Sequence, residues 1–158
     1  MKMKSETQAL HLARMMQRHM HIPSYELALP FIMVRSKKLK KLSVDDVLLT
    51  GFDRLEFLLI DGDTIRANMQ LKQIENTYKT EIIDLSEETA EQTDSKKYKT
   101  LKISFGTVQS KVLDLGHTID LTHSDLEKVT LVSKDKTIAE GSLVIVDEEI
   151  AIQIKEVN

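Results

Sequence analysis

The sequence predicts a mainly β protein that consists of two small tandem β-units preceded by one N-terminal α-helix. From Leu27 onward, short runs rich in Val, Ile and Leu alternate with charged or glycine-containing turns about every 8 to 12 residues, which is the pattern of short strands. A polar segment divides this region into two parts, and both parts show the same order of strands and turns. Together these observations predict a duplicated β-architecture.

Residues 1–26 are predicted to hold an amphipathic helix. Ser5 followed by Gln8 matches a capping box and Pro23 stops a helix, so we expect the helix from about residue 6 to residue 20. Its apolar face carries the residues of a candidate partner helix, which are Leu12, Met16 and Met20. Flexible methionine side chains suit either the edge of a core or an adaptable partner groove, and we give the core edge more weight.

The clearest hairpin joins strands expected at 55–60 and 64–67 through Asp61-Gly62-Asp63. An Asp-Gly pair readily adopts the positive φ angles that tight turns require. Oxygen ligands do not continue after this turn, so a hairpin explains the two aspartates better than a calcium loop does.

A linker is predicted over residues 86–98. Residues 86–97 contain one alanine and no larger apolar side chain, so this stretch can bury almost nothing. The linker separates a first unit at 27–85 from a second unit at 99–158. Units of this size have marginal cores of their own, so each is expected to need the other.

The two units repeat each other in sequence. Residues 34–39 match residues 108–113 (108 − 34 = 74), with identity at Val, Ser, Lys and Leu. Further along, 64–65 falls on 137–138 (137 − 64 = 73) and the closing strand at 81–85 falls on 153–157 (153 − 81 = 72), each at an almost constant offset.

The second unit carries a recognisable series of segments, namely Gly106-Thr107-Val108, Leu113-Asp114-Leu115-Gly116, Ile119-Asp120-Leu121, Val129-Thr130-Leu131-Val132, Ala139-Glu140-Gly141-Ser142-Leu143-Val144-Ile145-Val146 and Ala151-Ile152-Gln153-Ile154. This series resembles the surface-presentation-of-antigens (SPOA) domain of FliN and FliM, which occurs in tandem in the injectisome protein SctQ. The first unit resembles that domain only through the internal repeat.

The resemblance implies β-barrel units that pair by intertwining, as an intramolecular pseudo-dimer or in a homo-oligomer. It implies a structural component of the bacterial flagellar motor switch complex (C-ring) or of a type III secretion sorting platform. Such a component acts in motility or secretion, on the cytoplasmic face of the inner membrane as part of a basal body. Its partners would be FliM/FliN or SctQ-type proteins and a FliH- or SctL-like regulator of the export ATPase. The flagellar setting is favoured over the injectisome.

The same resemblance implies that a partner binds the stretch Leu143, Val144, Ile145 and Val146. Strand alternation would send two of these side chains to each face of the sheet, so one pair must enter the core. The other pair either forms an exposed apolar contact surface or is buried by strand exchange. The first unit has residues 70–73, which are more polar, at the corresponding place, and Asn68 in place of Gly141.

Composition favours protein partners over other ligands. The formal charge is −3 with a pI near 6.0, so the chain as a whole does not attract nucleic acid or anionic lipid. There are no cysteines, no signal peptide or membrane-spanning run is recognisable, and catalytic motifs are missing, so we expect a cytoplasmic protein without enzymatic activity, small-molecule substrate, cofactor or metal. The alternative function is a small β-barrel adaptor that binds nucleic acid through the basic run at residues 35–41.

Overall fold

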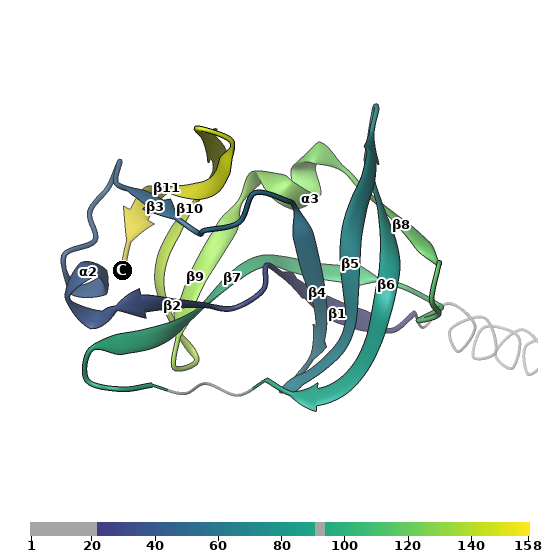
Figure 1. Ribbon diagram of the computed structural model, residues 1–158, viewed down its shortest axis with the longest axis horizontal. Helices are drawn as coiled ribbons and strands as arrows, with labels where there is room; N and C mark the ends of the chain where they lie inside the picture. Colours follow the sequence, from purple (N-terminus) through teal and green to yellow (C-terminus); the bar gives the residue numbers. More distant parts are fainter. Residues whose placement is uncertain (1–21, 91–93) are drawn as a thin grey trace, which may run out of the picture.

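The computed structural model describes residues 22–90 and 94–158. Within these ranges the chain is mainly β, as predicted, with eleven strands and two short helices (Figure 1). In chain order they are β1 (Ser24–Ala28), β2 (Ile32–Arg35), α2 (Ser36–Lys40), β3 (Val47–Leu49), β4 (Glu56–Asp61), β5 (Thr64–Ile74), β6 (Tyr78–Thr89), β7 (Tyr98–Gln109), β8 (Thr118–Leu121), α3 (His123–Glu127), β9 (Val129–Ser133), β10 (Lys136–Val146) and β11 (Glu149–Val157). The helix predicted at residues 6–20 lies outside the described residues.

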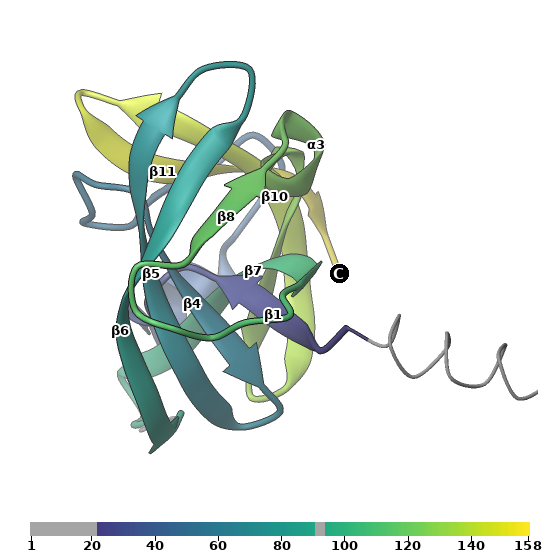
Figure 2. The same ribbon diagram turned by 90° about the vertical axis from the view of Figure 1, so that its right-hand side faces the viewer.

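The strands form one antiparallel sheet in the order β3-β11-β10-β9-β7-β1-β4-β5-β6-β8, and β2 pairs with β7 beside this path. Figure 1 shows β9, β10, β11 and β3 on the left and β4, β5, β6 and β8 on the right, and Figure 2 views the molecule from that right-hand side. Across residues 22–90 and 94–158, the end strands β3 and β8 do not pair with each other. The expected closed barrels are therefore wrong, because the end strands β3 and β8 belong to different halves and each has a single neighbour.

A central ribbon joins the two halves. Strand β7 is continuous, whereas the matching stretch of the first half is divided into β1 and β2 around Pro30, which has no amide N–H to donate. Tyr25 faces Val108, and Val34 faces Lys99. The repeat offset of 74 relates Tyr25 to Lys99 (25 + 74 = 99) and Val34 to Val108 (34 + 74 = 108). The two pairs are therefore equivalent, with the roles of the two halves reversed. The ribbon therefore has approximate two-fold symmetry.

Each half adds a meander of three strands to the ribbon, β4–β5–β6 in the first half and β9–β10–β11 in the second. Met69 faces Ile82 directly after a bulge, and Gly141 faces Ile154 directly after a bulge. The offset is 72 at both positions (141 − 69 and 154 − 82). The two meanders therefore share bulges as well as strand order.

The predicted match of residues 64–65 to 137–138, at an offset of 73, is wrong by one residue. The bulges place Gly141 in correspondence with Met69 and not with Asn68. The pairing with the preceding strand gives the same offset of 72, because Ile65 faces Ile60 and Thr137 faces Val132 before equivalent bulges. Thr137 therefore corresponds to Ile65 and not to Thr64.

A fourth strand lies beside each meander and comes from the other half. Strand β3 pairs with β11 so that Leu48 faces Ile152, and β8 pairs with β6 so that Ile119 faces Thr80. The two pairings are equivalent, with offsets of 119 − 48 = 71 and 152 − 80 = 72. The halves therefore exchange strands within one chain.

The turns before the exchanged strands are also equivalent. Asp45 has φ 76° and Gly116 has φ 84°, and 45 + 71 is 116. The Asp45 amide donates to the Ile154 carbonyl oxygen at 2.8 Å, and the Gly116 amide donates to the Ile82 carbonyl oxygen at 2.9 Å. Each turn thereby anchors its strand to the opposite half.

One hydrophobic core serves both halves. Its fully buried residues come from both sides of the central ribbon and include Leu27, Leu48, Phe57, Leu59, Met69, Ile82, Leu101, Ile103, Leu121, Leu131, Ile152 and Ile154. The rings of Phe57 and Phe105 meet edge to face, with their centroids 5.5 Å apart. The contacts that fold one half are therefore made with the other half.

The predicted linker at 86–98 is too long. Strand β6 continues to Thr89, which faces Thr64, and β7 already begins at Tyr98. Polar side chains do not prevent this extension, because a strand needs only backbone partners when its side chains face solvent. At the other end of the first half, β1 begins at Ser24, before the predicted boundary at 27.

The substitution Gly141→Ala is expected to lower the free energy of unfolding by about 2 kcal/mol. An added Cβ would press on the Gln153 carbonyl oxygen and lie 2.9 Å from Ile152 Cγ2, so β10 and β11 would have to move apart. Urea denaturation followed by circular dichroism measures the change. The neighbouring Ser142→Ala is the control, with an expected change below about 0.5 kcal/mol. Equal losses in both variants would contradict the close approach at Gly141.

Neither half is expected to fold alone, because each lacks its exchanged strand and part of the core. Fragments 22–90 and 94–158, produced separately, should show no cooperative thermal transition by circular dichroism. When mixed in equal amounts, they should recover the transition of the full chain. A cooperative transition in either fragment alone would show that strand exchange is dispensable.

Candidate functional site

The predicted partner-binding stretch lies on β10, and its side chains divide between the two faces of the sheet. Leu143 faces Ile152, which faces Leu48, and this row packs in the core. The next residue along β10, Val144, faces Ala151 of β11, which in turn faces Leu49 of β3. Because side chains alternate along a strand, these three residues point to the opposite, outer face of the sheet.

The outer face carries exposed apolar side chains on β3 and β10, on either side of the buried Ala151 of β11. We call Val47, Leu49, Val144 and Val146 the apolar patch. The exposed fractions are 41% for Val47, 50% for Leu49 and 36% for Val146, and Val144 is half-buried. The patch therefore offers aliphatic side chains of β3 and β10 to a partner.

Half of the apolar patch was missed by the sequence analysis. Val47 and Leu49 belong to the first half and precede their pairing partners on β11 by slightly more than a hundred residues (153 − 47 = 106; 151 − 49 = 102), so only strand exchange brings them together. The alternation of Val47 and Leu49 around the buried Leu48 was the available signal, but it does not reveal which strand lies beside it.

Ile145 is 65% exposed but lies on the core side of the sheet, at the outer end of β10 opposite Ile150. Its counterpart in the first half is Ile74, which faces Tyr78 and is 62% exposed. Because both halves expose an isoleucine here, Ile145 does not distinguish them. We therefore leave it out of the apolar patch.

The corresponding outer face of the first half is polar. Gln73 faces Lys79, which faces Asp120, and all three are exposed. Lys72 is an extra bulged residue beside this row, and its Nζ lies 3.5 Å from Glu81 Oε2. The predicted correspondence of 70–73 with 143–146 is thus corrected: Val144 corresponds to Gln73, because the bulge shifts the register.

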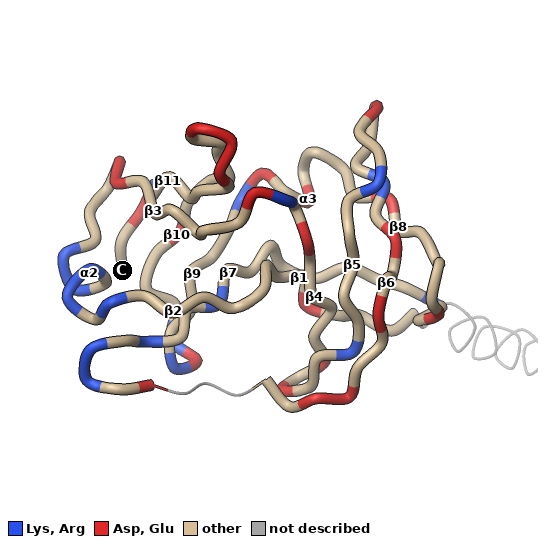
Figure 3. Tube along the Cα trace, viewed as in Figure 1, with Lys and Arg blue, Asp and Glu red and all other residues tan. Residues whose placement is uncertain are grey.

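Acidic side chains border the apolar patch at the tip of the β10–β11 hairpin, where Asp147 and Glu148 form the turn (Figure 3). Glu149 follows them, and its carboxylate accepts a hydrogen bond from the Gly51 amide at 3.4 Å. A segment with apolar anchors and basic flanking residues would complement this surface in shape and charge.

The basic run at residues 35–41 occupies the end of β2, helix α2 and the residue after it. The structure brings it beside Lys96 and Lys97, and in Figure 3 this end of the molecule is rich in Lys and Arg. Phe31, the nearest aromatic residue in the sequence, packs against a small buried cluster and is not free to stack on bases. Nucleic-acid binding remains a prediction.

The N-terminal candidate residues Leu12, Met16 and Met20 lie outside the described residues. In the part of the chain that the structure covers, no group of three His, Asp or Glu side chains is arranged to hold a metal ion. Among the same residues, no helix has the length and apolar character needed to cross a bilayer.

The chain was compared with protein-family models and with curated proteins. No family model and no curated protein matches it.

Proposed function

We propose that this chain is a structural component of the flagellar motor switch complex or of a type III secretion sorting platform, assembling with FliM/FliN or SctQ-type proteins. The main support for this proposal is the approximate two-fold symmetry of the fold. The two halves of one chain exchange strands, because β3 pairs with β11 and β8 pairs with β6. The SPOA resemblance implies an intertwined pair of this kind. Here one chain supplies both members, as an intramolecular pseudo-dimer.

The apolar patch is the docking surface in this proposal, and its occupant is the N-terminal segment of a FliH-like protein. A partner that covers these aliphatic side chains removes apolar surface from water, which is the dominant favourable contribution in most protein–protein contacts. The edge strand β3 is only three residues long, so a partner strand added there would gain few hydrogen bonds. Affinity must therefore come mainly from apolar contact.

The polar row beside the first meander supports a division of labour between the two meanders. Gln73, Lys79 and Asp120 occupy the places of Val144, Ala151 and Leu49. One frame therefore presents one apolar and one polar outer face. In the assembly, the second half receives the FliH-like segment while the chain as a whole sits at the basal body with FliM/FliN-type proteins.

Replacing Leu49 by Asp and Val144 by Gln together is expected to weaken binding of a purified FliH-like segment by about 10- to 100-fold. These substitutions transfer Gln73 and Asp120, which occupy the equivalent places beside the first meander, so the fold should tolerate them. Isothermal titration calorimetry measures the dissociation constant, and size-exclusion chromatography with purified FliM- and FliN-type proteins tests assembly.

The matched control is Ile74→Asp, because Ile74 is an exposed isoleucine on the equivalent hairpin of the first half. It should leave binding unchanged. Equal binding by the double variant and the wild type would remove the patch from the proposal. Failure of the wild-type chain to bind any FliM-, FliN-, SctQ- or FliH-type protein would overturn the function itself.

A further inference from the structure

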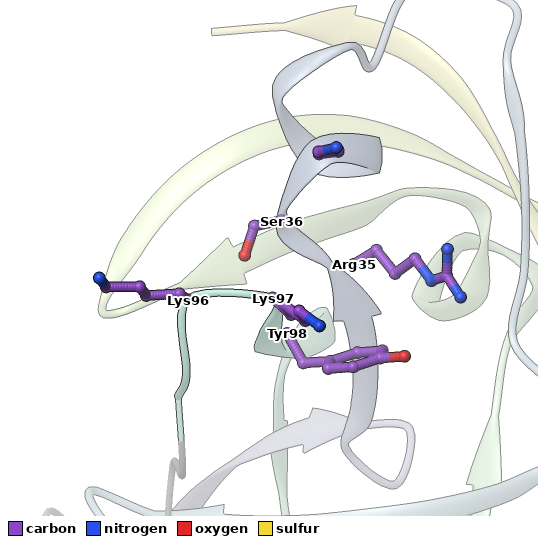
Figure 4. Close-up of a pocket in the computed structure, with 6 residues that line it drawn as sticks. Arg35, Ser36, Lys96, Lys97 and Tyr98 are labelled. Atoms are coloured by element: carbon purple, nitrogen blue, oxygen red, sulfur yellow. The ribbon is translucent and has the colours of Figure 1, made fainter.

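A second surface feature lies at the opposite end of the central ribbon from Pro23, where the end of β2 and the start of β7 meet α2. A cavity of about 300 Å³ opens here, lined by Arg35, Ser36, Lys37, Lys96, Lys97 and Tyr98 (Figure 4). We call it the basic pocket. Arg35 and Tyr98 face each other across β2 and β7, so strand pairing itself brings its two walls together.

The Ser36 side chain is an unpartnered polar group in this pocket. Only 7% of Ser36 is exposed, and its Oγ has no hydrogen-bond partner among the described residues. Its amide donates to the Lys97 carbonyl oxygen at 2.8 Å, which holds the residue in place. Figure 4 shows the hydroxyl turned towards the Lys96–Lys97 segment. A buried hydroxyl without a partner is unfavourable, so a ligand that bonds to it would be stabilised.

The pseudo-symmetry supplies an internal comparison. Ser110 occupies the equivalent place (36 + 74 = 110), is 5% exposed, and its amide donates to the Pro23 carbonyl oxygen at 3.1 Å. The Ser110 Oγ, however, donates to the Val112 carbonyl oxygen at 2.7 Å. The two serines therefore share one backbone position and differ in whether the hydroxyl is satisfied.

The charges around the two serines also differ. Under the same offset of 74, Arg35 corresponds to Gln109, Lys97 to Pro23 and Lys96 to Ile22. Lys37 corresponds to Lys111, so only one positive charge is common to both places. The basic pocket thus has three more positive charges than its counterpart, although the backbone frame is the same.

Neighbouring residues add to the positive potential. The pKa of the Lys99 ammonium lies below its ordinary value, chiefly because the Lys134 side chain lies beside it. The nearby carboxylate of Asp94 accepts the Thr100 amide at 2.8 Å and lies 4.0 Å from Lys134 Nζ, so it is already engaged. Cations crowded in this way favour a multiply charged anion.

We propose that the basic pocket binds the phosphate group of a small organic phosphate, with Arg35 and Lys97 neutralising its charge and the Ser36 hydroxyl donating to one of its oxygens. A guanidinium and a phosphate match as two parallel hydrogen bonds, and a phosphate has acceptor oxygens left for the serine and lysines. Helix α2 is too short to contribute a useful dipole, so the side chains carry the proposal. The inference does not depend on the proposed assembly role.

A single phosphate group fits these observations better than a nucleic-acid strand. Sequence-tolerant binding of single strands uses several aromatic side chains as stacking platforms. Of the residues lining the pocket, only Tyr98 is aromatic, with 40% of it exposed. The single buried hydroxyl likewise fits one phosphate group, whereas a nucleic-acid strand would need a series of contacts along its backbone.

Isothermal titration calorimetry of the full chain at about 150 mM salt tests the proposal with pyrophosphate, ATP and a single-stranded oligonucleotide as separate probes. The wild type is expected to bind pyrophosphate or ATP with a dissociation constant below about 1 mM. Ser36→Ala and Arg35→Gln should each weaken binding about tenfold. The matched controls Ser110→Ala and Lys111→Gln should leave it unchanged. Tighter binding of ATP than of pyrophosphate would identify a nucleotide as the source of the phosphate.

Stability measurements separate ligand binding from a structural role of Ser36. Ser36→Ala should keep or raise the midpoint of urea denaturation, because it removes an unsatisfied hydroxyl, whereas Ser110→Ala should lower the midpoint. A lowered midpoint in Ser36→Ala with unchanged pyrophosphate binding would overturn the proposal. So would the failure of both phosphate probes to bind, or oligonucleotide binding that is insensitive to Ser36→Ala.

Discussion

The antiparallel pairing of β7 with β1 and β2 is the constraint on which the other elements depend. It places the two halves about an approximate two-fold axis, with Tyr25 opposite Val108 on one side and Val34 opposite Lys99 on the other. The meanders then extend to opposite sides, where each can reach the strand that leaves the other half. Strand exchange and the shared core follow from this arrangement, because neither half could bury its apolar face alone.

The repeated frame shows where the two halves have come to differ. Equivalent backbone positions carry an apolar row beside the second meander and a polar row beside the first. Likewise, a basic pocket surrounds Ser36, whereas the equivalent place around Ser110 has fewer charges. A requirement of the fold would act on both copies alike. Differences confined to one copy therefore point to binding, and each copy serves as a control for the other.

Compensation between neighbouring side chains explains how one frame accepts such differences in its interior. In the first half, Met69 fills space beside Thr80, whose hydroxyl lies 3.6 Å from the Met69 sulfur. In the second half, the equivalent pair is Gly141 and Ile152, so the large side chain has moved to the other strand. The large Ile152 side chain leaves no room for a side chain at position 141, where an added Cβ would lie 2.9 Å from Ile152 Cγ2.

The sequence by itself determined the features that depend on neighbouring residues. The Asp61-Gly62 turn, the β character from residue 27 onward and the order of the repeat all follow from local turn chemistry and apolar patterning. Only the tertiary structure decided which strands lie side by side. The unshared bulge at Lys72 shifted the repeat by one residue, β6 continued into the predicted linker, and strand exchange brought Val47 and Leu49 near Val144. These outcomes depend on backbone pairing between distant segments, because a strand's sequence states which face is apolar but not which neighbour covers it.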